Sequence, residues 1–155
     1  MCAIVDANAR DEVFGQHPTE AGRLFLDWLS TKSGRLVIGG RLKDELLTSA
    51  RFKTWLARAV SLGRAFQIPD DSVARETKRI EEAGTLESND SHVIALATVS
   101  GTRLLYSNDR ALQRDFKTGL GKGVRGVIYT TTRSEHVTRG QRRMLRRKDI
   151  CGRVL

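Results

Sequence analysis

The sequence predicts an α/β fold, a single domain in which a mostly parallel sheet is flanked by helices. Two observations carry this prediction. Short apolar, partly β-branched runs alternate along the chain with longer stretches of helical periodicity, in the order β-α-β-α-α-β-α-α-β-α-β. The length of 155 residues suits one domain, and a domain of this size buries roughly 68–70% of the surface of its unfolded chain, so it needs no disulfide or metal to hold its core.

Five strands are predicted from apolar runs bounded by turn-forming residues. They cover residues 2–5, 35–38, 66–68, 103–106 and 127–130. The first run ends at Asp6, and residues 6–8 supply the turn-forming side chains of a loop. A glycine-rich segment, residues 119–126, precedes the last strand and lacks the spacing of a phosphate-binding loop. We interpret that segment as a connector.

The helices are predicted from apolar residues that recur every three or four positions. They cover residues 21–29, 42–47, 52–60, 71–83, 91–100 and 110–116. Residues 70–72 offer N-caps for the fourth of these helices, and Gly84 and Gly101 are the expected C-caps of the fourth and fifth. Asp90 and Asp109 stand where the last two helices begin.

Most of the excess positive charge lies near the C-terminus. Residues 1–118 hold 17 basic and 16 acidic residues, whereas residues 119–155 hold 10 and 2, so the latter account for +8 of the formal net charge of +9. Such a stretch favours a polyanionic partner, nucleic acid first and an anionic membrane surface second, over a tail kept only for solubility. We therefore divide the chain into a body, residues 1–132, and a basic C-terminal extension, residues 133–155.

Six cations of this extension are candidates for contacts with nucleic acid. They are Arg139, Arg142, Arg143, Arg146, Arg147 and Lys148. In a helix they would cover much of the circumference, so we expect poor packing but good contact with phosphates. Phosphate contacts give affinity and salt dependence without reading sequence. No aromatic residue follows Tyr129, so the extension is not expected to stack on bases.

Several classes of protein are disfavoured. The longest apolar run is about five residues and the N-terminus resembles no signal peptide, so we expect a cytoplasmic protein with no membrane partner. Cys2 and Cys151 stand alone at the two ends, and His17, His92 and His136 are scattered. Neither a zinc finger nor a Cys/His protease is therefore expected.

Four acids sit where a carboxylate is costly without a partner. Asp6 ends a buried strand, Glu45 lies on the inward side of its helix, Asp90 opens an apolar helix and Asp109 follows a strand. Each has an ordinary explanation: Asp90 and Asp109 are good N-caps, Asp6 could close a turn, and Glu45 could pair with a nearby Lys or Arg. Together they could converge on one edge of the sheet, where like charges repel unless a cation neutralises them.

A set of carboxylates without imidazole or thiolate favours Mg²⁺ or Mn²⁺. A site of this kind would hold a phosphodiester and a water molecule, lower the pKa of the water and stabilise the leaving oxygen. His92 lies two residues after Asp90 and could touch a substrate, although a lone helical histidine is more often structural. The acids thus indicate metal-dependent hydrolysis.

Four segments resemble, in order and spacing, the acidic motifs of the PIN-domain nucleases. They are Ile4-Val-Asp6-Ala-Asn8, Leu42-Lys-Asp-Glu45-Leu-Leu, Asn89-Asp90-Ser-His-Val-Ile-Ala-Leu-Ala97 and Leu104-Leu-Tyr-Ser107-Asn-Asp109-Arg-Ala-Leu. The resemblance covers about residues 2–130. It implies that the body, residues 1–132, is a single PIN-like nuclease domain, an endonuclease that depends on Mg²⁺ or Mn²⁺ and most often cuts RNA.

The resemblance also implies roles for individual residues. The metal-binding catalytic acids would be Asp6, Glu45, Asp90 and Asp109. Asn8 and Ser107 would orient a carboxylate or a water molecule. Asp115 is a candidate fifth acid, which could equally pair with Arg114 or Lys117.

Small bacterial PIN proteins are often VapC-type toxins, ribonucleases that a partner antitoxin holds inactive, and many form homodimers. The size and motif order of this chain agree with that group. Two alternatives stay open. One is a PIN-fold nuclease that acts on DNA or on a particular nucleic-acid structure, for example in defence, and the other is a non-catalytic module that binds nucleic acid.

Overall fold

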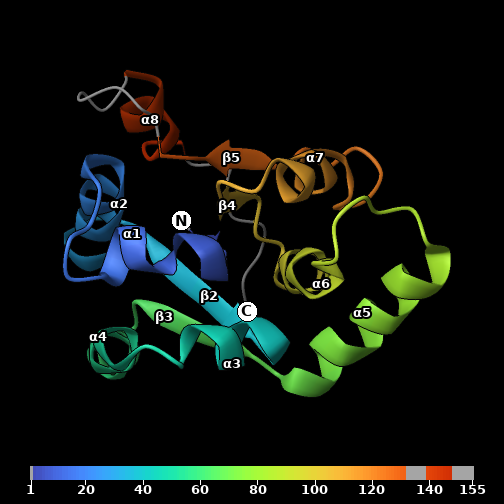
Figure 1. The fold of residues 1–155 in the computed structure, drawn as a ribbon, viewed down its shortest axis with the longest axis horizontal. Coiled ribbons are helices and arrows are strands. Elements are labelled where there is room, and N and C mark those ends of the chain that lie inside the picture. The colour runs from blue at the N-terminus through green and yellow to red at the C-terminus, as the bar shows by residue number, and fades with distance from the viewer. Residues whose placement is uncertain (1, 132–138, 148–155) are drawn as a thin grey trace.

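One five-stranded parallel sheet organises the molecule (Figure 1). The computed structural model describes residues 2–131 and 139–147. The strands are β1 (Cys2–Val5), β2 (Arg35–Gly39), β3 (Ala65–Ile68), β4 (Leu104–Tyr106) and β5 (Val127–Tyr129). They lie in the order β3-β2-β1-β4-β5, and each neighbouring pair is parallel. The predicted α/β fold class is confirmed.

Helices cover both faces of this sheet. They are α1 (Arg10–Phe14), α2 (Glu20–Thr31), α3 (Gly40–Leu46), α4 (Ala50–Ser61), α5 (Asp70–Ala83), α6 (Ser91–Ser100), α7 (Arg110–Thr118) and α8 (Arg139–Met144). Helices α1, α2 and α4 lie on one side of the sheet, and α6 and α7 lie on the other (Figure 1). Within the described residues, no helix is both long and apolar enough to cross a membrane.

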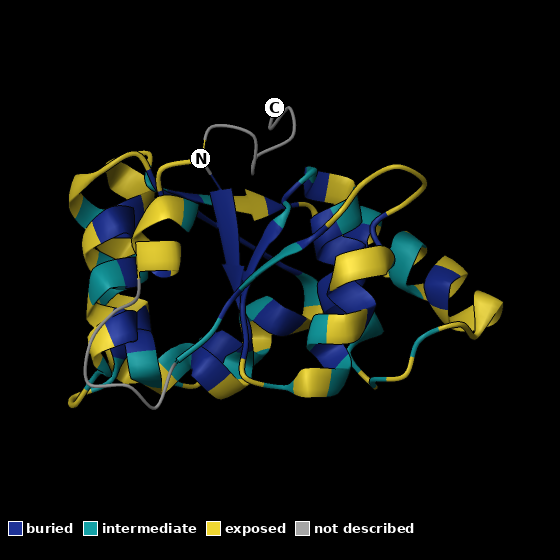
Figure 2. Cartoon of the chain, turned by 90° about the horizontal axis from the view of Figure 1, so that it is seen from above, coloured by how far each residue is buried: buried dark blue, intermediate teal, exposed yellow. Residues whose placement is uncertain are grey.

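The core lies between the sheet and these helices (Figure 2). All four residues of β1 are buried, as expected of a parallel strand with helices on both faces. Phe25 of α2 packs against Tyr106 and Tyr129, with ring centroids 5.1 Å apart in each pair. The Tyr129 hydroxyl donates a 2.6 Å hydrogen bond to the Ala21 carbonyl, which satisfies its polar end inside the core.

The segment after β1 is helical, where the sequence predicts a loop. A 3-10 turn (Ala7–Ala9) leads directly into α1. The Phe14 ring lies 5.0 Å from the Phe52 ring and 4.8 Å from the Trp55 ring, centroid to centroid, on α4. A five-residue helix is too short to be stable alone, so this packing stabilises it. It is also too short for an apolar periodicity in the sequence to predict it.

The caps of α5 and α6 follow the prediction at one end only. Gly84 and Gly101 are left-handed C-caps, with φ angles of 64° and 72°. At the start of α5, however, the N-cap is Pro69, and Asp70 already belongs to the helix. The Asp70 carboxylate instead accepts a 3.2 Å hydrogen bond from the Gly40 backbone N–H, and so joins the start of α5 to α3.

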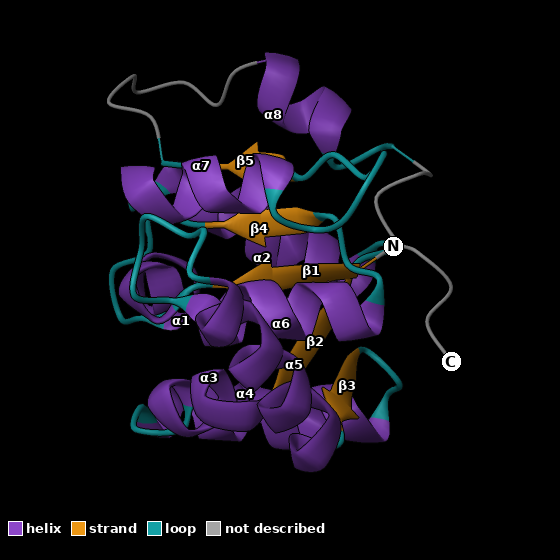
Figure 3. Ribbon diagram, turned by 90° about the vertical axis from the view of Figure 1, so that its right-hand side faces the viewer, coloured by secondary structure: helices purple, strands orange, loops and turns teal. Residues whose placement is uncertain are grey.

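Helix α8 belongs to the predicted basic extension and lies beyond the edge strand β5 (Figure 3). Leu145 is buried, and Gln141 donates a 2.7 Å hydrogen bond to the Thr130 carbonyl. The expectation of poor packing is therefore wrong here, because these two residues, four apart, face the body. The predicted phosphate-binding arginines of this stretch are exposed: Arg139, Arg142, Arg143, Arg146 and Arg147. Lys148 and the predicted boundary at 132/133 lie outside the described residues.

Candidate functional site

The predicted site lies at the carboxyl ends of two neighbouring strands, β1 and β4. β1 and β4 are neighbours, and the chain leaves β1 toward α1 on one face and β4 toward α7 on the other (Figure 1). In open α/β sheets, ligands bind at such a switch point, because the diverging connections leave a crevice outside the strand ends. Asp6 directly follows β1 and Asp109 lies three residues after β4.

Asp6 is a buried carboxylate, with 4% of its surface exposed. Ser107 Oγ donates a 2.9 Å hydrogen bond to its Oδ2, and the nearby Asn8 backbone N–H also favours the charged form. Burial nevertheless raises the pKa of Asp6, and the charges of Asp90 and Asp109 raise it further against these two groups. The charged form of Asp6 would thus gain from a cation.

Ser107 joins two of the four acids. It is fully buried at the end of β4. Its Oγ donates to Asp6 and accepts a 3.1 Å hydrogen bond from the Asp109 backbone N–H. The Gln113 side chain donates a 2.7 Å hydrogen bond to the Ser107 carbonyl from within α7. One hydroxyl therefore fixes the loop that carries Asp109 against the carboxylate of Asp6.

Asp109 and Asp90 begin their helices differently. Asp109 Oδ1 accepts a 3.1 Å hydrogen bond from the Leu112 backbone N–H, as predicted for an N-cap. Asp90 also occupies an N-cap position, but its side chain makes no capping hydrogen bond, so that ordinary explanation fails for it. Burial raises the pKa of Asp90, and Asp109 and Glu45 raise it further, while His92 and Arg41 oppose them.

Glu45 reaches the same region from α3. Its carboxylate Oε1 lies 3.0 Å from Arg41 Nε and 3.4 Å from His92 Nε2. The predicted ion pair with a nearby cation is therefore present, one helical turn away. The Glu45 side chain is only half-buried, whereas His92 is buried.

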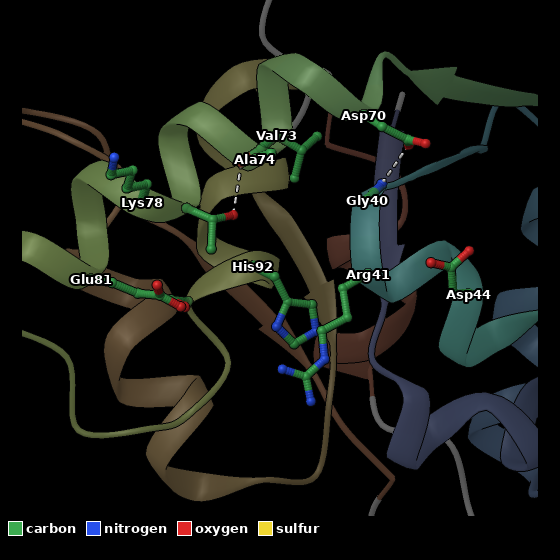
Figure 4. A pocket seen from close by; sticks show the side chains of 11 residues that line it. Gly40, Arg41, Asp44, Asp70, Val73, Ala74, Lys78, Glu81 and His92 are labelled. Carbon is green, nitrogen blue, oxygen red and sulfur yellow. Dashed lines mark hydrogen bonds between the residues drawn. The ribbon is translucent and has the colours of Figure 1, made fainter.

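A recess of about 440 Å³ lies beside this pair, between α3, α5 and α6. Arg41 and His92 line it side by side, as Figure 4 shows. The other charged side chains of its wall are Asp44, Asp70, Lys78 and Glu81. The recess thus opens next to the acids and carries charges of both signs.

The four predicted acids are coupled through their charges. Asp6 is affected by Asp90 and Asp109, and Asp90 by Asp109 and Glu45. As they stand, no three Asp, Glu, His or Cys side chains among residues 2–131 and 139–147 are close enough to bind one metal ion together. The donor set fits a hard divalent cation in kind, since it consists of carboxylate oxygens. The acids are neighbours that repel one another rather than a closed ligand shell.

The two other predicted supporting residues, Asn8 and Asp115, act in different ways. The Asn8 side chain is exposed, and the contribution of this residue to Asp6 is its backbone N–H. Asp115 is buried and accepts hydrogen bonds of 3.0 and 2.8 Å from the backbone N–H groups of Glu87 and Ser88. Asp115 therefore anchors the loop that leads to Asp90.

Sequence reasoning missed a polar network beside Asp109. Glu12 of α1 accepts a 2.8 Å hydrogen bond from Asn108 Nδ2 and another from the Thr131 hydroxyl. Asn108 Oδ1 in turn accepts a 3.0 Å hydrogen bond from the Thr131 backbone N–H. The sequence does not point to Glu12, because no apolar periodicity predicts α1, the five-residue helix that carries it.

One tripeptide occurs twice in the sequence, and the predictions from sequence did not use it. Residues 88–90 and residues 107–109 both read Ser-Asn-Asp, and each directly precedes a helix. Two of the four acids, Asp90 and Asp109, therefore each follow the same Ser-Asn pair.

Comparison of the chain with models of protein families, with curated proteins and with solved structures finds no match. What is shown for this protein is therefore a single α/β sheet of five parallel strands with helices on both faces.

Proposed function

We propose that this protein is a divalent-metal-dependent endonuclease that hydrolyses RNA phosphodiester bonds. The observation that carries the proposal is the buried Asp6, which directly follows β1 and lies close enough to Asp90 and Asp109 to feel their charges. Burial raises the pKa of its carboxyl group, and the charges of Asp90 and Asp109 raise it further. Uncompensated negative charge at a ligand-binding edge is stabilised by a bound cation.

The metal would be Mg²⁺ or Mn²⁺, held by Asp6, Glu45, Asp90 and Asp109. When bound, it would activate a water molecule and stabilise the charge that develops on the phosphate and the leaving oxygen. Ser107 would keep the carboxylates of Asp6 and Asp109 in one arrangement through its two hydrogen bonds. The Asp90 side chain makes no capping hydrogen bond, so its carboxylate would be available to the cation.

The wider proposal takes its terms from the resemblance to PIN nucleases. The sheet order β3-β2-β1-β4-β5, all parallel, is compatible with a PIN-like fold. On this basis the chain is proposed to be the toxin of a toxin–antitoxin pair, with an antitoxin as protein partner and a homodimer as its assembly. The recess beside Arg41 and His92 gives room for a nucleotide next to the scissile phosphate.

The test of the chemistry is cleavage of RNA by Asp6→Asn and Asp90→Asn, with Asp71→Asn, an exposed acid on α5, as the matched control. Loss of even a supporting residue of a metal site typically costs about 10- to 100-fold. We therefore expect both variants to lose at least about 100-fold in rate, the control to stay within about twofold, and wild-type cleavage to stop in a chelator.

Two outcomes would contradict the proposal. Cleavage that persists in both variants would remove the acids from the mechanism. Binding of RNA without metal and without turnover would favour the non-catalytic module. Preferential cutting of DNA over a matched RNA under the same metal and salt would keep the nuclease and replace its substrate.

Helix α8 is proposed to hold the phosphate backbone of the substrate. Its arginines are exposed while Gln141 and Leu145 fix it to the body. Each phosphate contact contributes about 0.9 to the slope of log K against log salt for duplex DNA and about 0.7 for single strands. Replacing Arg142, Arg143 and Arg146 by Gln should therefore flatten that slope for single-stranded RNA by up to about 2, and an unchanged slope would exclude α8 from the interface.

A further inference from the structure

A second recess, of about 570 Å³, lies between α2 and α8. Its wall includes Lys32 and Ser33, which connect α2 to the start of β2. Asp6 and Asp109 instead follow the carboxyl ends of β1 and β4, and β1 runs parallel to β2. The recess therefore reaches the edge of the sheet opposite to the acids. Its volume is that of a small-molecule site, about 300–1,000 Å³.

Apolar side chains from both helices form part of the wall. Leu24 and Trp28 lie one turn apart on α2, and Leu145 directly follows α8. Trp28 and Leu145 are buried, and Leu24 is half-buried. Gly34 packs so closely on the indole of Trp28 that a Cβ there would lie 2.5 Å from a ring carbon, so the ring is held in place. The recess thus suits a ligand with an apolar body.

The indole of Trp28 also brings a buried donor that has no acceptor. Its Nε1 makes no hydrogen bond to any residue in the described part of the chain. The other indole differs, since Trp55 Nε1 donates a 3.3 Å hydrogen bond to Ser30 Oγ. Buried Trp N–H groups usually have a partner. Because Trp28 lines the recess, a ligand that binds there with an acceptor atom supplies the missing one.

The charged side chains of the wall are mostly cations. Lys32, Arg142 and Arg146 are exposed, and Asp27 is the only acid among the described residues that line the recess. None of the three cations forms a salt bridge with a described residue. Three positive charges against one negative charge favour an anionic ligand.

We propose that this recess binds an organic anion that has an apolar body and one anionic head. The body lies against the three apolar side chains of the wall, and the head meets the three exposed cations. A bare phosphate backbone matches only the cations and leaves the apolar wall uncovered. The site is independent of the proposed nuclease activity, because none of its residues belongs to the group of acids.

The experiment measures binding of anilinonaphthalene sulfonate, an aromatic body with one sulfonate, to the full chain through the fluorescence of the dye. The double variant Arg142→Gln/Arg146→Gln is compared with Arg139→Gln/Arg143→Gln. Each variant removes two exposed positive charges, but only the first pair lines the recess. We expect the first variant to weaken binding by about tenfold and the control by less than about twofold. Equal weakening in two folded variants would overturn the proposal.

The indole N–H signals in a ¹H–¹⁵N spectrum give a second readout with an internal control. The chain has two Trp residues, so two signals are expected, and Trp55→Phe identifies them. Titration with naphthoate, which carries a carboxylate on the aromatic body, should shift the signal of Trp28 and leave that of Trp55 in place. A Trp28 signal that stays unchanged at saturating naphthoate would contradict the site.

Competition for the bound dye identifies the source of the ligand. Displacement by naphthoate indicates an aromatic body and displacement by decanoate an aliphatic one, and displacement by neither would overturn the proposal. Displacement by single-stranded RNA alone, weakened equally in both double variants, would assign these arginines to phosphate contacts and overturn it as well. No metal and no RNA enters the dye measurement, so this inference can hold in a protein that cuts no RNA and can fail in one that does.

Discussion

Two segments of identical sequence, Ser-Asn-Asp, open helices α6 and α7 and do different work. We call residues 88–90 the first segment and residues 107–109 the second. In both, the serine Oγ accepts a hydrogen bond from the aspartate N–H, at 3.4 Å in the first and 3.1 Å in the second. In the second, Ser107 also binds Asp6 and Asp109 caps its helix, whereas in the first Asp90 caps nothing.

The difference comes from what each segment follows. The second segment directly follows β4, so its serine is buried beside the end of β1 and Asp6. The first follows a loop that Asp115 anchors from α7 through the N–H groups of Glu87 and Ser88. The same local sequence thus supplies both aspartates. Their different positions in the fold leave Asp109 in a capping hydrogen bond and Asp90 without one.

The largest contrast is expected at the serines. Ser107→Ala removes the donor to Asp6 and the acceptor of the Asp109 N–H, so RNA cleavage should fall about 10- to 100-fold and the free energy of unfolding by about 1–3 kcal/mol. Ser88→Ala removes one long hydrogen bond at a half-buried site, so cleavage should stay within about twofold and stability within about 0.5 kcal/mol.

Cleavage rates at saturating Mn²⁺ and urea unfolding check this contrast. Circular dichroism of both variants is the control for folding. Equal losses in the two variants would show that the segments are equivalent, and the positional argument would then fail.

The aspartates should differ by a smaller amount, in stability rather than in rate. Asp109→Ala loses an N-cap, which typically costs about 1 kcal/mol, whereas Asp109→Asn keeps a capping side chain and should lose only a few tenths. Asp90→Ala and Asp90→Asn lose no cap, so both should match or exceed the wild-type free energy of unfolding at neutral pH in a chelator.

This comparison of Ala and Asn at two positions separates charge from capping. Urea unfolding at one pH measures all four variants. A loss of about 1 kcal/mol in Asp90→Ala that Asp90→Asn restores would show that Asp90 caps α6 in solution, contrary to the structure.

Much of the fold follows from the sequence because buried parallel strands leave plain signals. The apolar run of β1 and the alternation of strands with amphipathic helices predict the α/β class correctly. α1 carries no such signal, since its five residues are held by contacts of Phe14 with Phe52 and Trp55 from another helix. The expectation that α8 packs poorly is wrong because it rests on the six cations of this stretch and overlooks Gln141 and Leu145, the two residues that contact the body.

The candidate site shows where this reasoning stops. Asp6, Asp90 and Asp109 could be placed near one edge of the sheet because the carboxyl ends of parallel strands meet there. Sequence could not tell that Asp109 caps its helix and Asp90 does not, because both precede a helix in the same tripeptide. Nor could it show that His92 is buried with its Nε2 3.4 Å from the Glu45 carboxylate, which depends on the packing of α6 against α3.

The smallest expected effect is a pH dependence that belongs to the first segment. Burial and the charges of Asp109 and Glu45 raise the pKa of Asp90 in the folded protein above 3.8, its ordinary value. Below pH 3.8 the carboxyl is protonated in both states and adds no pH dependence. Above it the unfolded chain ionises first, so the folded protein binds more protons and loses stability as the pH rises, until the pH exceeds the folded pKa.

The stability of Asp90→Asn relative to the wild type should therefore grow as the pH rises from 3.8 and then become constant. Because the Asp90 carboxyl is only half-buried and solvent screens it, we expect the gain to stay below about 1 kcal/mol. Urea unfolding in a chelator between pH 3.5 and 7 measures the gain. A difference that is flat across this range would mean that Asp90 meets no net repulsion, and with it the reason to expect a cation at the first segment would disappear.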